Sequence, residues 1–159
     1  MGSLYRSQHE LVLVFRNGKV PHRNNVELGR HGRHRSNVWT YRGANSFGAE
    51  RKAELDSHPT VKPIALVADA LLDVSKRGDI VLDPFGGSGS TLIAAHKTGR
   101  RARLIEIDPH YCDVVVRRFQ KYTGTNAISA STGQTFEELT EHRLAHDNLE
   151  QLAAAGALQ

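Results

Sequence analysis

A glycine-rich turn with an acid on either side is the part of the sequence whose residue types best suit chemistry. The turn, Gly86 to Gly89, follows the short apolar run Ile80–Leu82, separated from it by Asp83, Pro84 and Phe85. Glycines adopt backbone angles that other residues avoid, and without side chains they let a ligand approach the main chain. Glu106 follows Gly86 by 20 residues, the spacing at which an acid after a second strand can hold ribose hydroxyls. The pattern predicts a site for a ligand that contains a nucleoside.

The elements that must position this site follow from apolar runs and helix signals. The run Ile80–Leu82 has the length of a strand buried on both faces, and residues 104–107 predict a second strand. An alanine-rich segment between them predicts a helix over residues 91–99, ended by a glycine and capped by Ser90 or Thr91. The free N–H groups of its first turn would face the ligand. Strand, helix and strand together indicate a βαβ unit.

Two common nucleotide-binding loops do not match this turn. A P-loop requires Gly-Lys-Ser/Thr after its glycines, and no lysine occurs between Lys76 and Lys97. A dinucleotide loop requires a third glycine three residues after Gly89, where this chain has Leu92. A metabolic Rossmann enzyme with a chance Pro-Phe before its glycines is the remaining alternative.

Two motifs carry a resemblance to a known family. Residues 83–91, Asp-Pro-Phe-Gly-Gly-Ser-Gly-Ser-Thr, resemble the S-adenosylmethionine loop of DNA amino-methyltransferases, in which Asp-Pro-Phe-x-Gly-Ser-Gly-Thr-Thr is usual. Upstream, residues 58–63 are similar to the family's His-Pro-Thr-x-Lys-Pro segment. The stretch 5–10 followed by an apolar strand, Leu11–Phe15, is similar to the segment after the family's catalytic strand. The resemblance extends from about residue 3 to about residue 124, with both motifs in the expected order.

The resemblance implies an α/β chain with a Rossmann-like S-adenosylmethionine-dependent methyltransferase fold, partial because it is truncated at its N-terminal side. The implied cofactor is S-adenosylmethionine, with Thr60 and Lys62 at its methionine carboxylate and Glu106 at its ribose. Phe85 packed in the core, Asp83 as a plain strand-end acid and Lys62 as a solvated lysine stay open as alternatives. The residues implied to bind the cofactor are Thr60, Lys62, Asp83, Pro84, Phe85, Gly86, Gly87, Ser88, Gly89, Thr91 and Glu106.

The catalytic tetrapeptide of that family is absent from this sequence. The resemblance implies Asp-Pro-Pro-Tyr or Asn-Pro-Pro-Tyr upstream of Gln8, yet none of the 5 prolines is adjacent to another. We therefore expect the cofactor-binding part of an enzyme that methylates adenine N6 or cytosine N4 in DNA, without a catalytic residue of its own. The alternative is a non-catalytic cofactor- or DNA-binding remnant, or a subunit of a split methyltransferase. A sheet lacking its catalytic strand predicts a dimer, or association with the missing catalytic half.

Composition limits the cellular context. The chain has 159 residues, a net charge of +4 and one cysteine, Cys112, so no internal disulfide framework is predicted. No apolar run approaches the roughly 20 residues of a membrane helix, and no signal-peptide pattern is present. These features predict a cytoplasmic protein without membrane attachment.

Positive charge is concentrated between residues 11 and 49, and we call the basic loop region at residues 20–57 the basic segment. Between residues 11 and 49 there are seven Arg or Lys side chains and a single acid, Glu27. Such side chains bind phosphate, so double-stranded DNA is the predicted partner. The alternative is an ordinary surface loop with Trp39 buried in a short strand. No cysteine or acid accompanies the segment's histidines at ligand spacing, so no metal site is predicted. The candidate DNA contacts are Arg23, Arg30, Arg33 and Arg35.

The predicted organisation is a partial methyltransferase domain, 1–124, followed by a linker and C-terminal helix, 125–159. The domain divides into a strand segment (1–19), the basic segment and the βαβ region (58–124). A helix follows Pro63 and ends at Gly78. Another starts at Pro109 with Asp108 as its cap. Thr135–Glu138 forms a capping box that opens the last helix.

Overall fold

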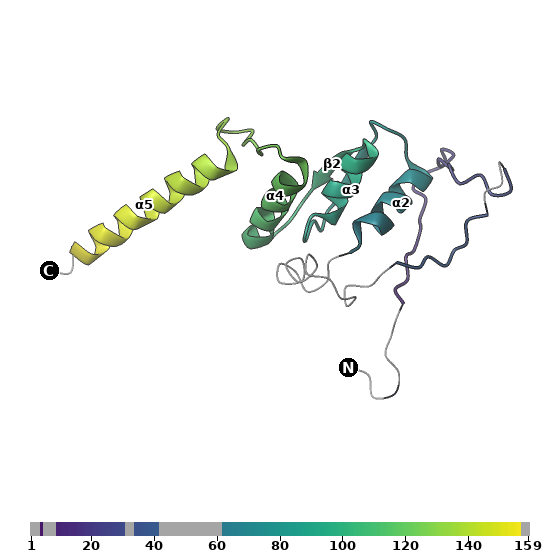
Figure 1. The fold of residues 1–159 in the computed structure, drawn as a ribbon, viewed down its shortest axis with the longest axis horizontal. Helices are drawn as coiled ribbons and strands as arrows, with labels where there is room; N and C mark the ends of the chain where they lie inside the picture. The colour runs from purple at the N-terminus through teal and green to yellow at the C-terminus, as the bar shows by residue number, and fades with distance from the viewer. Residues whose placement is uncertain (1–3, 5–8, 31–33, 42–61, 157–159) are drawn as a thin grey trace.

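The computed structural model describes residue 4 and residues 9–30, 34–41 and 62–156, without the side chains of 148, 150 and 152–156. Helices α2, α3 and α4 lie side by side around a small sheet, whereas α5 projects away from them (Figure 1). In chain order the elements are α2 (Ile64–Val74), β1 (Ile80–Asp83), α3 (Ser90–Thr98), β2 (Arg101–Leu104), α4 (Pro109–Thr123) and α5 (Phe136–Gly156).

The predicted βαβ unit is present. β1 and β2 pair in parallel, with Ile80 opposite Arg101 and Asp83 opposite Leu104. The predicted bounds of the second strand, 104–107, were wrong, because β2 starts at Arg101 and ends at Leu104. Pairing ends where β1 ends: the Ile105 N–H donates to the Asp83 carbonyl at 2.9 Å, and β1 offers no residue beyond it.

Only one face of this sheet is covered in the described part of the chain. Val81 and Leu104 are half-buried on the covered face. Ile80 and Leu82 point to the other face and are 59% and 64% exposed, so the prediction of a strand buried on both faces was wrong. The open face also carries the exposed side chains of Arg101 and Arg103, which lie opposite Ile80 and Leu82. An apolar strand is buried on both faces only when other elements of the fold cover both faces of its sheet.

The apolar run Leu11–Phe15 is not a strand in the structure. It has no regular structure and makes no strand pairing with the rest of the described chain. The five side chains are between 71% and 85% exposed. A strand is stabilised by its neighbours rather than by its own sequence, and here no strand lies beside it among the described residues.

Helices α2 and α3 form the core, which contains Ala68, Ile93, Ala94 and Ala95. The helix predicted over 91–99 is confirmed, and Gly99 ends it in the left-handed region at φ +72°. The predicted cap by Ser90 or Thr91 was wrong: the N-cap is Gly89, without a side-chain cap. The Ser90 hydroxyl instead donates to the Lys62 carbonyl at 2.9 Å.

The first helix also differs from its prediction at one end. The helix after Pro63 is present, but it ends at Val74 rather than at Gly78. Ser75 caps it in an extended conformation, and its N–H donates to the Leu71 carbonyl. Gly78, at φ +83°, belongs to the turn that leads into β1.

Arg100 is buried where α2 and α3 both end. Its exposed fraction is 8%, and its guanidinium donates to the carbonyls of Ser75 at 2.6 Å and Thr98 at 2.5 Å. A third bond joins Nε to the Ser75 hydroxyl at 3.0 Å. The carbonyl ends of helices carry partial negative charge, so two helix ends compensate the buried cation in place of a carboxylate.

Helix α4 begins as predicted. Pro109 occupies its first turn, and the Asp108 carboxylate accepts a hydrogen bond from the His110 N–H at 2.8 Å. Gly124 ends the helix at φ +69°. Asp108, the N-cap of α4, follows the end of β2 at Leu104 closely. Helix α4 therefore starts near the glycine turn and packs against α3.

Helix α5 opens with the predicted capping box. The Glu138 N–H donates to the Thr135 hydroxyl at 3.2 Å, and the Glu138 carboxylate accepts from the Thr135 N–H at 2.8 Å. The N–H groups of Thr135 and Glu138, which lack helical partners, are therefore both hydrogen-bonded.

None of the helices in the described residues is long and apolar enough to cross a membrane.

The capping box predicts an acid-dependent change at the start of α5. Hydrogen bonds from Thr135 hold the pKa of Glu138 below its ordinary value of 4.5, so its stabilising effect is complete above that value and is lost as pH falls through the lowered pKa. Hydrogen exchange of the Thr135 amide, measured by NMR between pH 7 and pH 3, should show this loss. Glu138→Gln should remove the acid-dependent step, whereas Glu141→Gln, one turn away and exposed, should keep it. An unchanged step in Glu138→Gln would contradict the assignment.

Candidate functional site

A pocket of about 380 Å³ lies over the glycine turn, where four segments meet. The four are the end of β1 with the glycine turn, the start of α2, the start of α3, and the stretch from Glu106 to Tyr111 that leads into α4. The lining residues are Lys62, Val67, Asp83, Phe85, Gly86, Gly87, Ser88, Ser90, Thr91, Glu106 and Tyr111.

The glycine turn has the backbone that its sequence predicts. Gly87 and Gly89 lie in the left-handed region at φ +50° and +78°, and the Gly89 N–H closes the turn on the Gly86 carbonyl at 2.9 Å. Gly86 is needed for a different reason. Its N–H donates to the Ile105 carbonyl at 2.8 Å, and a Cβ there would lie 3.3 Å from Leu104 Cδ2.

Glu106 joins the end of β2 to this turn. Its carboxylate accepts a hydrogen bond from the Gly87 N–H at 2.7 Å. The other oxygen accepts from the N–H groups of Ile107 at 2.9 Å and Asp108 at 3.0 Å. A half-buried carboxylate held by three backbone donors stays oriented, and it presents its acceptor oxygens on the wall of the pocket.

Lys62 stands at the pocket entrance, just before α2. Its ammonium forms an ion pair with Glu10 at 2.5 Å, and both side chains are at least half exposed. Exposed pairs of this kind contribute little stability. Lys62 can therefore exchange Glu10 for another anion at small cost.

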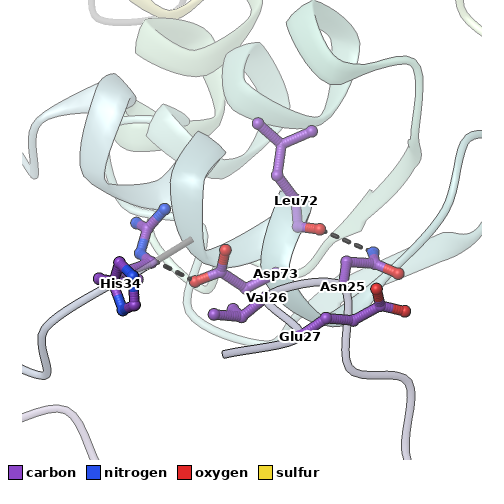
Figure 2. A pocket seen from close by; sticks show the side chains of 7 residues that line it. Asn25, Val26, Glu27, His34, Leu72 and Asp73 are labelled. Atoms are coloured by element: carbon purple, nitrogen blue, oxygen red, sulfur yellow. Dashed lines mark hydrogen bonds and ion pairs between the residues drawn. The ribbon is translucent and has the colours of Figure 1, made fainter. Parts of the chain in front are cut away.

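A second, more open pocket of about 790 Å³ lies where the basic segment meets α2 (Figure 2). Asn25 anchors the segment: its side-chain amide donates to the carbonyls of Leu72 at 2.8 Å and Ser75 at 2.7 Å. These carbonyls belong to the C-terminal end of α2 and lack helical donors, so Asn25 completes the helix end. His34, Glu27 and Asp73 also line this pocket.

Arg35 is attached to α2 rather than directed to solvent. Its guanidinium lies 3.2 Å from the Asp73 carboxylate and 3.5 Å from that of Asp69, and it stacks on Trp39 at 4.1 Å. Burial raises the pKa of Asp73 against the lowering effect of Arg35. Burial, together with the hydrogen bond from its hydroxyl to Asp69, likewise raises the pKa of Tyr41.

A family model described as DNA methylase matches residues 3–117, which is most of the chain. This chain belongs to the N6/N4 DNA methylase family. The match includes the glycine turn, Glu106 and the basic segment, so both regions described above lie inside it.

Curated relatives agree with this membership. The chain is 34% identical to the type II methyltransferase M2.DpnII of Streptococcus pneumoniae over 68% of its length and 40% of that protein. It is 36% identical to the orphan methyltransferase M.BamHII of Bacillus amyloliquefaciens over 55% of its length and 33% of that protein. The chain therefore spans less than half the length of these relatives.

A solved structure supports the fold. The cytosine-N4-specific PvuII DNA methyltransferase matches 61% of this chain and 36% of its own, with a TM-score of 0.50 and 22% identity. The chain therefore has a partial Rossmann-like methyltransferase fold, with a small parallel sheet and its helices.

Most of the residues predicted to bind the cofactor line the first pocket. Pro84 and Gly89 belong to the same loop without lining it, and Thr60 lies outside the described residues. Phe85 is 86% exposed, so the structure does not support its alternative role in the core. The predicted residues on the pocket wall are Lys62, Asp83, Phe85, Gly86, Gly87, Ser88, Thr91 and Glu106.

Sequence reasoning missed three residues of the pocket. No sequence signal placed Val67 or Tyr111 at this site, and Ser90 was predicted only as a cap, yet all three line the pocket. Their positions in the sequence could have indicated that they belong to the pocket. Each lies within the first turn or so of a helix that begins at the same end of the sheet as the glycine turn, where ligands of α/β folds bind.

The predicted DNA contacts are distributed unevenly. Arg23 is exposed, and Arg30 is exposed with a loose contact of 3.9 Å to Glu27. Arg35 is held by Asp69 and Asp73, and Arg33 lies outside the described residues. No group of three or more His, Cys, Asp or Glu side chains suited to a metal occurs among the residues that the structure describes.

Proposed function

We propose that this chain binds S-adenosylmethionine in the pocket over the glycine turn and forms the cofactor part of a DNA methyltransferase acting on adenine N6 or cytosine N4. One observation carries the proposal: residues implied by two separate motifs, with Lys62 from one and most of the loop between Asp83 and Thr91 from the other, line a single pocket with Glu106. They are separated by up to 44 positions in the sequence. A chance resemblance would not require them to meet.

The chemistry of the pocket suits the parts of this ligand. The start of α3 and the Lys62 ammonium favour a carboxylate. Glu106 offers acceptor oxygens to ribose hydroxyls, and the rings of Phe85 and Tyr111 offer flat apolar surfaces to a purine. Bound S-adenosylmethionine would supply an electrophilic methyl group. The residues present bind and orient; none of them is proposed to act on the target base.

Methyl transfer is proposed to require a segment that carries the catalytic tetrapeptide. The open face of the sheet, with Ile80, Leu82, Arg101 and Arg103, is the surface we propose for it. A second copy of this chain, giving a dimer, would be the other occupant. Light scattering of the purified chain tests the choice: a monomer that becomes a defined complex on addition of the N-terminal part of a related methyltransferase supports the first, and a stable dimer supports the second.

Double-stranded DNA is the proposed partner of the basic segment. Arg23 and Arg30 are exposed on the described part of the segment, which is anchored to α2 through Asn25 and Arg35. The alternative function is a non-catalytic cofactor- or DNA-binding subunit. Binding of duplex DNA should fall with added salt, and it should weaken when both arginines become glutamine.

Calorimetric titration of S-adenosylmethionine tests the central proposal. We expect binding by the wild-type chain and none by Gly87→Arg, because a long side chain at φ +50° fills the pocket and strains the turn. Circular dichroism must show that both proteins are folded. A folded wild-type chain that does not bind would refute the cofactor role and leave DNA binding as the function to test.

A further inference from the structure

Helix α4 also contacts the glycine turn through two side chains, Val115 and Arg118, that do not line the pocket. Val115 packs against Gly89, where a Cβ would lie 3.0 Å from Val115 Cγ1. One helical turn later, the Arg118 guanidinium donates to the Ser88 carbonyl at 2.7 Å. Arg118 is half-buried and does not line the pocket. Arg118 therefore contacts the glycine turn from outside the pocket.

The Ser88 carbonyl belongs to a peptide group that needs such a restraint. Ser88 lies between Gly87 and Gly89, both with positive φ, and glycine's backbone rotates more freely than that of other residues. A hydrogen bond from a charged donor is stronger than one between neutral groups. Arg118 thus fixes the plane of the Ser88–Gly89 peptide, immediately before the first residue of α3.

The same guanidinium reaches a second part of the pocket wall. It lies 3.4 Å from the Ser90 hydroxyl, and that hydroxyl donates to the Lys62 carbonyl at 2.9 Å. Arg118, Ser88, Ser90 and Lys62 therefore connect α4, the glycine turn and the entrance of α2. Through these hydrogen bonds, the Arg118 side chain, which lies outside the pocket, links three of the segments that line it.

We propose that Arg118 is a positioning residue for the cofactor: it holds the glycine turn so that the N-terminal end of α3 faces the pocket. The inference rests on the proposed function, because it assigns a role in binding S-adenosylmethionine. It also makes a claim about the chain without ligand, namely that Arg118 keeps the turn ordered before anything binds. That second claim can be measured separately.

The experiment compares Arg118→Met and Arg118→Lys with Arg117→Met as a matched control. Arg117 is the preceding residue of α4, exposed, and its guanidinium faces the Phe136 ring at 5.3 Å instead of the turn. NMR hydrogen exchange of the Gly89 amide, which is bonded to the Gly86 carbonyl, reports order in the turn. Calorimetry reports affinity for S-adenosylmethionine, and thermal unfolding reports global stability.

We expect Arg118→Met to accelerate exchange at Gly89 by about tenfold and to weaken S-adenosylmethionine binding by a similar factor, as the loss of one charged hydrogen bond implies. Arg118→Lys, which keeps a charged donor, should restore part of both, and Arg117→Met should change neither. Equal exchange at Gly89 in Arg118→Met and Arg117→Met would overturn the proposal. So would acceleration spread evenly over α3 and α4, since that would indicate a general structural role.

The two proposals fail in different ways. If the folded wild-type chain does not bind S-adenosylmethionine, the cofactor function fails and, with it, the assignment of Arg118 to cofactor positioning, whatever the exchange data show. If the wild-type chain binds but Arg118→Met binds equally well with unchanged exchange, only the role of Arg118 fails. Should Arg118→Met not fold, the Arg118→Lys variant carries the test, with intermediate exchange at Gly89 and intermediate affinity as the supporting result and wild-type values as the overturning one.

Discussion

Replacing Gly89 with alanine is expected to weaken S-adenosylmethionine binding by about ten- to a hundredfold. Gly89 lies at φ +78°, a conformation that costs a residue with a Cβ roughly 1–2 kcal/mol. The new methyl group would also lie 3.0 Å from Val115 Cγ1 and 3.2 Å from its Cγ2, so α4 or the turn must shift. Calorimetric titration of the purified variant measures the loss.

Two further variants separate the causes. Gly133→Ala imposes the same backbone penalty at φ +73°, in a turn with no atom within 4 Å of the new Cβ, so it should leave affinity unchanged. Adding Val115→Ala to Gly89→Ala removes the steric contact but not the backbone strain, and should recover part of the affinity. Wild-type affinity in Gly89→Ala would show that the turn does not shape the pocket as described.

Replacing Arg100 with methionine is expected to lower the free energy of unfolding by about 3 kcal/mol. The substitution keeps much of the apolar stem but removes the Arg100 donors to the Ser75 and Thr98 carbonyls and to the Ser75 hydroxyl, while the Ser75 carbonyl keeps its bond from the Asn25 amide. These groups end α2 and α3, and Thr98 is buried. Thermal unfolding should show a decrease of about 6–12 °C in Tm for a chain of this size.

Arg101→Met is the matched control. Arg101 is exposed and donates through Nε to the Gly78 carbonyl at 3.0 Å, so its loss should change Tm by no more than a degree or two. Hydrogen exchange should place the effect of Arg100→Met at the ends of α2 and α3. Similar Tm values for the two variants would contradict the view that Arg100 joins the helix ends.

The sequence predicted the parts of the structure that depend on local signals. Gly87 and Gly89 adopt the backbone angles expected of them, Asp108 caps α4, and Thr135 with Glu138 forms the box that opens α5. Each feature needs only a few neighbouring residues to form. The pocket was predictable for a related reason, because most of its residues belong to two short motifs.

Features that depend on distant partners were not predictable. Leu11–Phe15 has the composition of a strand, but it remains without one beside it in the described chain. Ile80 and Leu82 are as apolar as buried residues and yet stay exposed. The ion pairs of Arg35 with Asp69 and Asp73 were equally unpredictable. The sequence shows that Arg35 is charged, but it does not show that the side chain packs against helix α2.

Helix α2 contacts both the first pocket and the basic segment. Lys62 and Val67, at its start, line the first pocket, while Asp69 and Asp73, further along, hold the basic segment through Arg35. An 11-residue helix is only about 16 Å long, so the two regions lie within a few helical turns of each other. Any displacement of the basic segment by DNA would therefore reach the cofactor pocket through α2. Cofactor and DNA would then be energetically coupled, and each would change the other's affinity by the same factor.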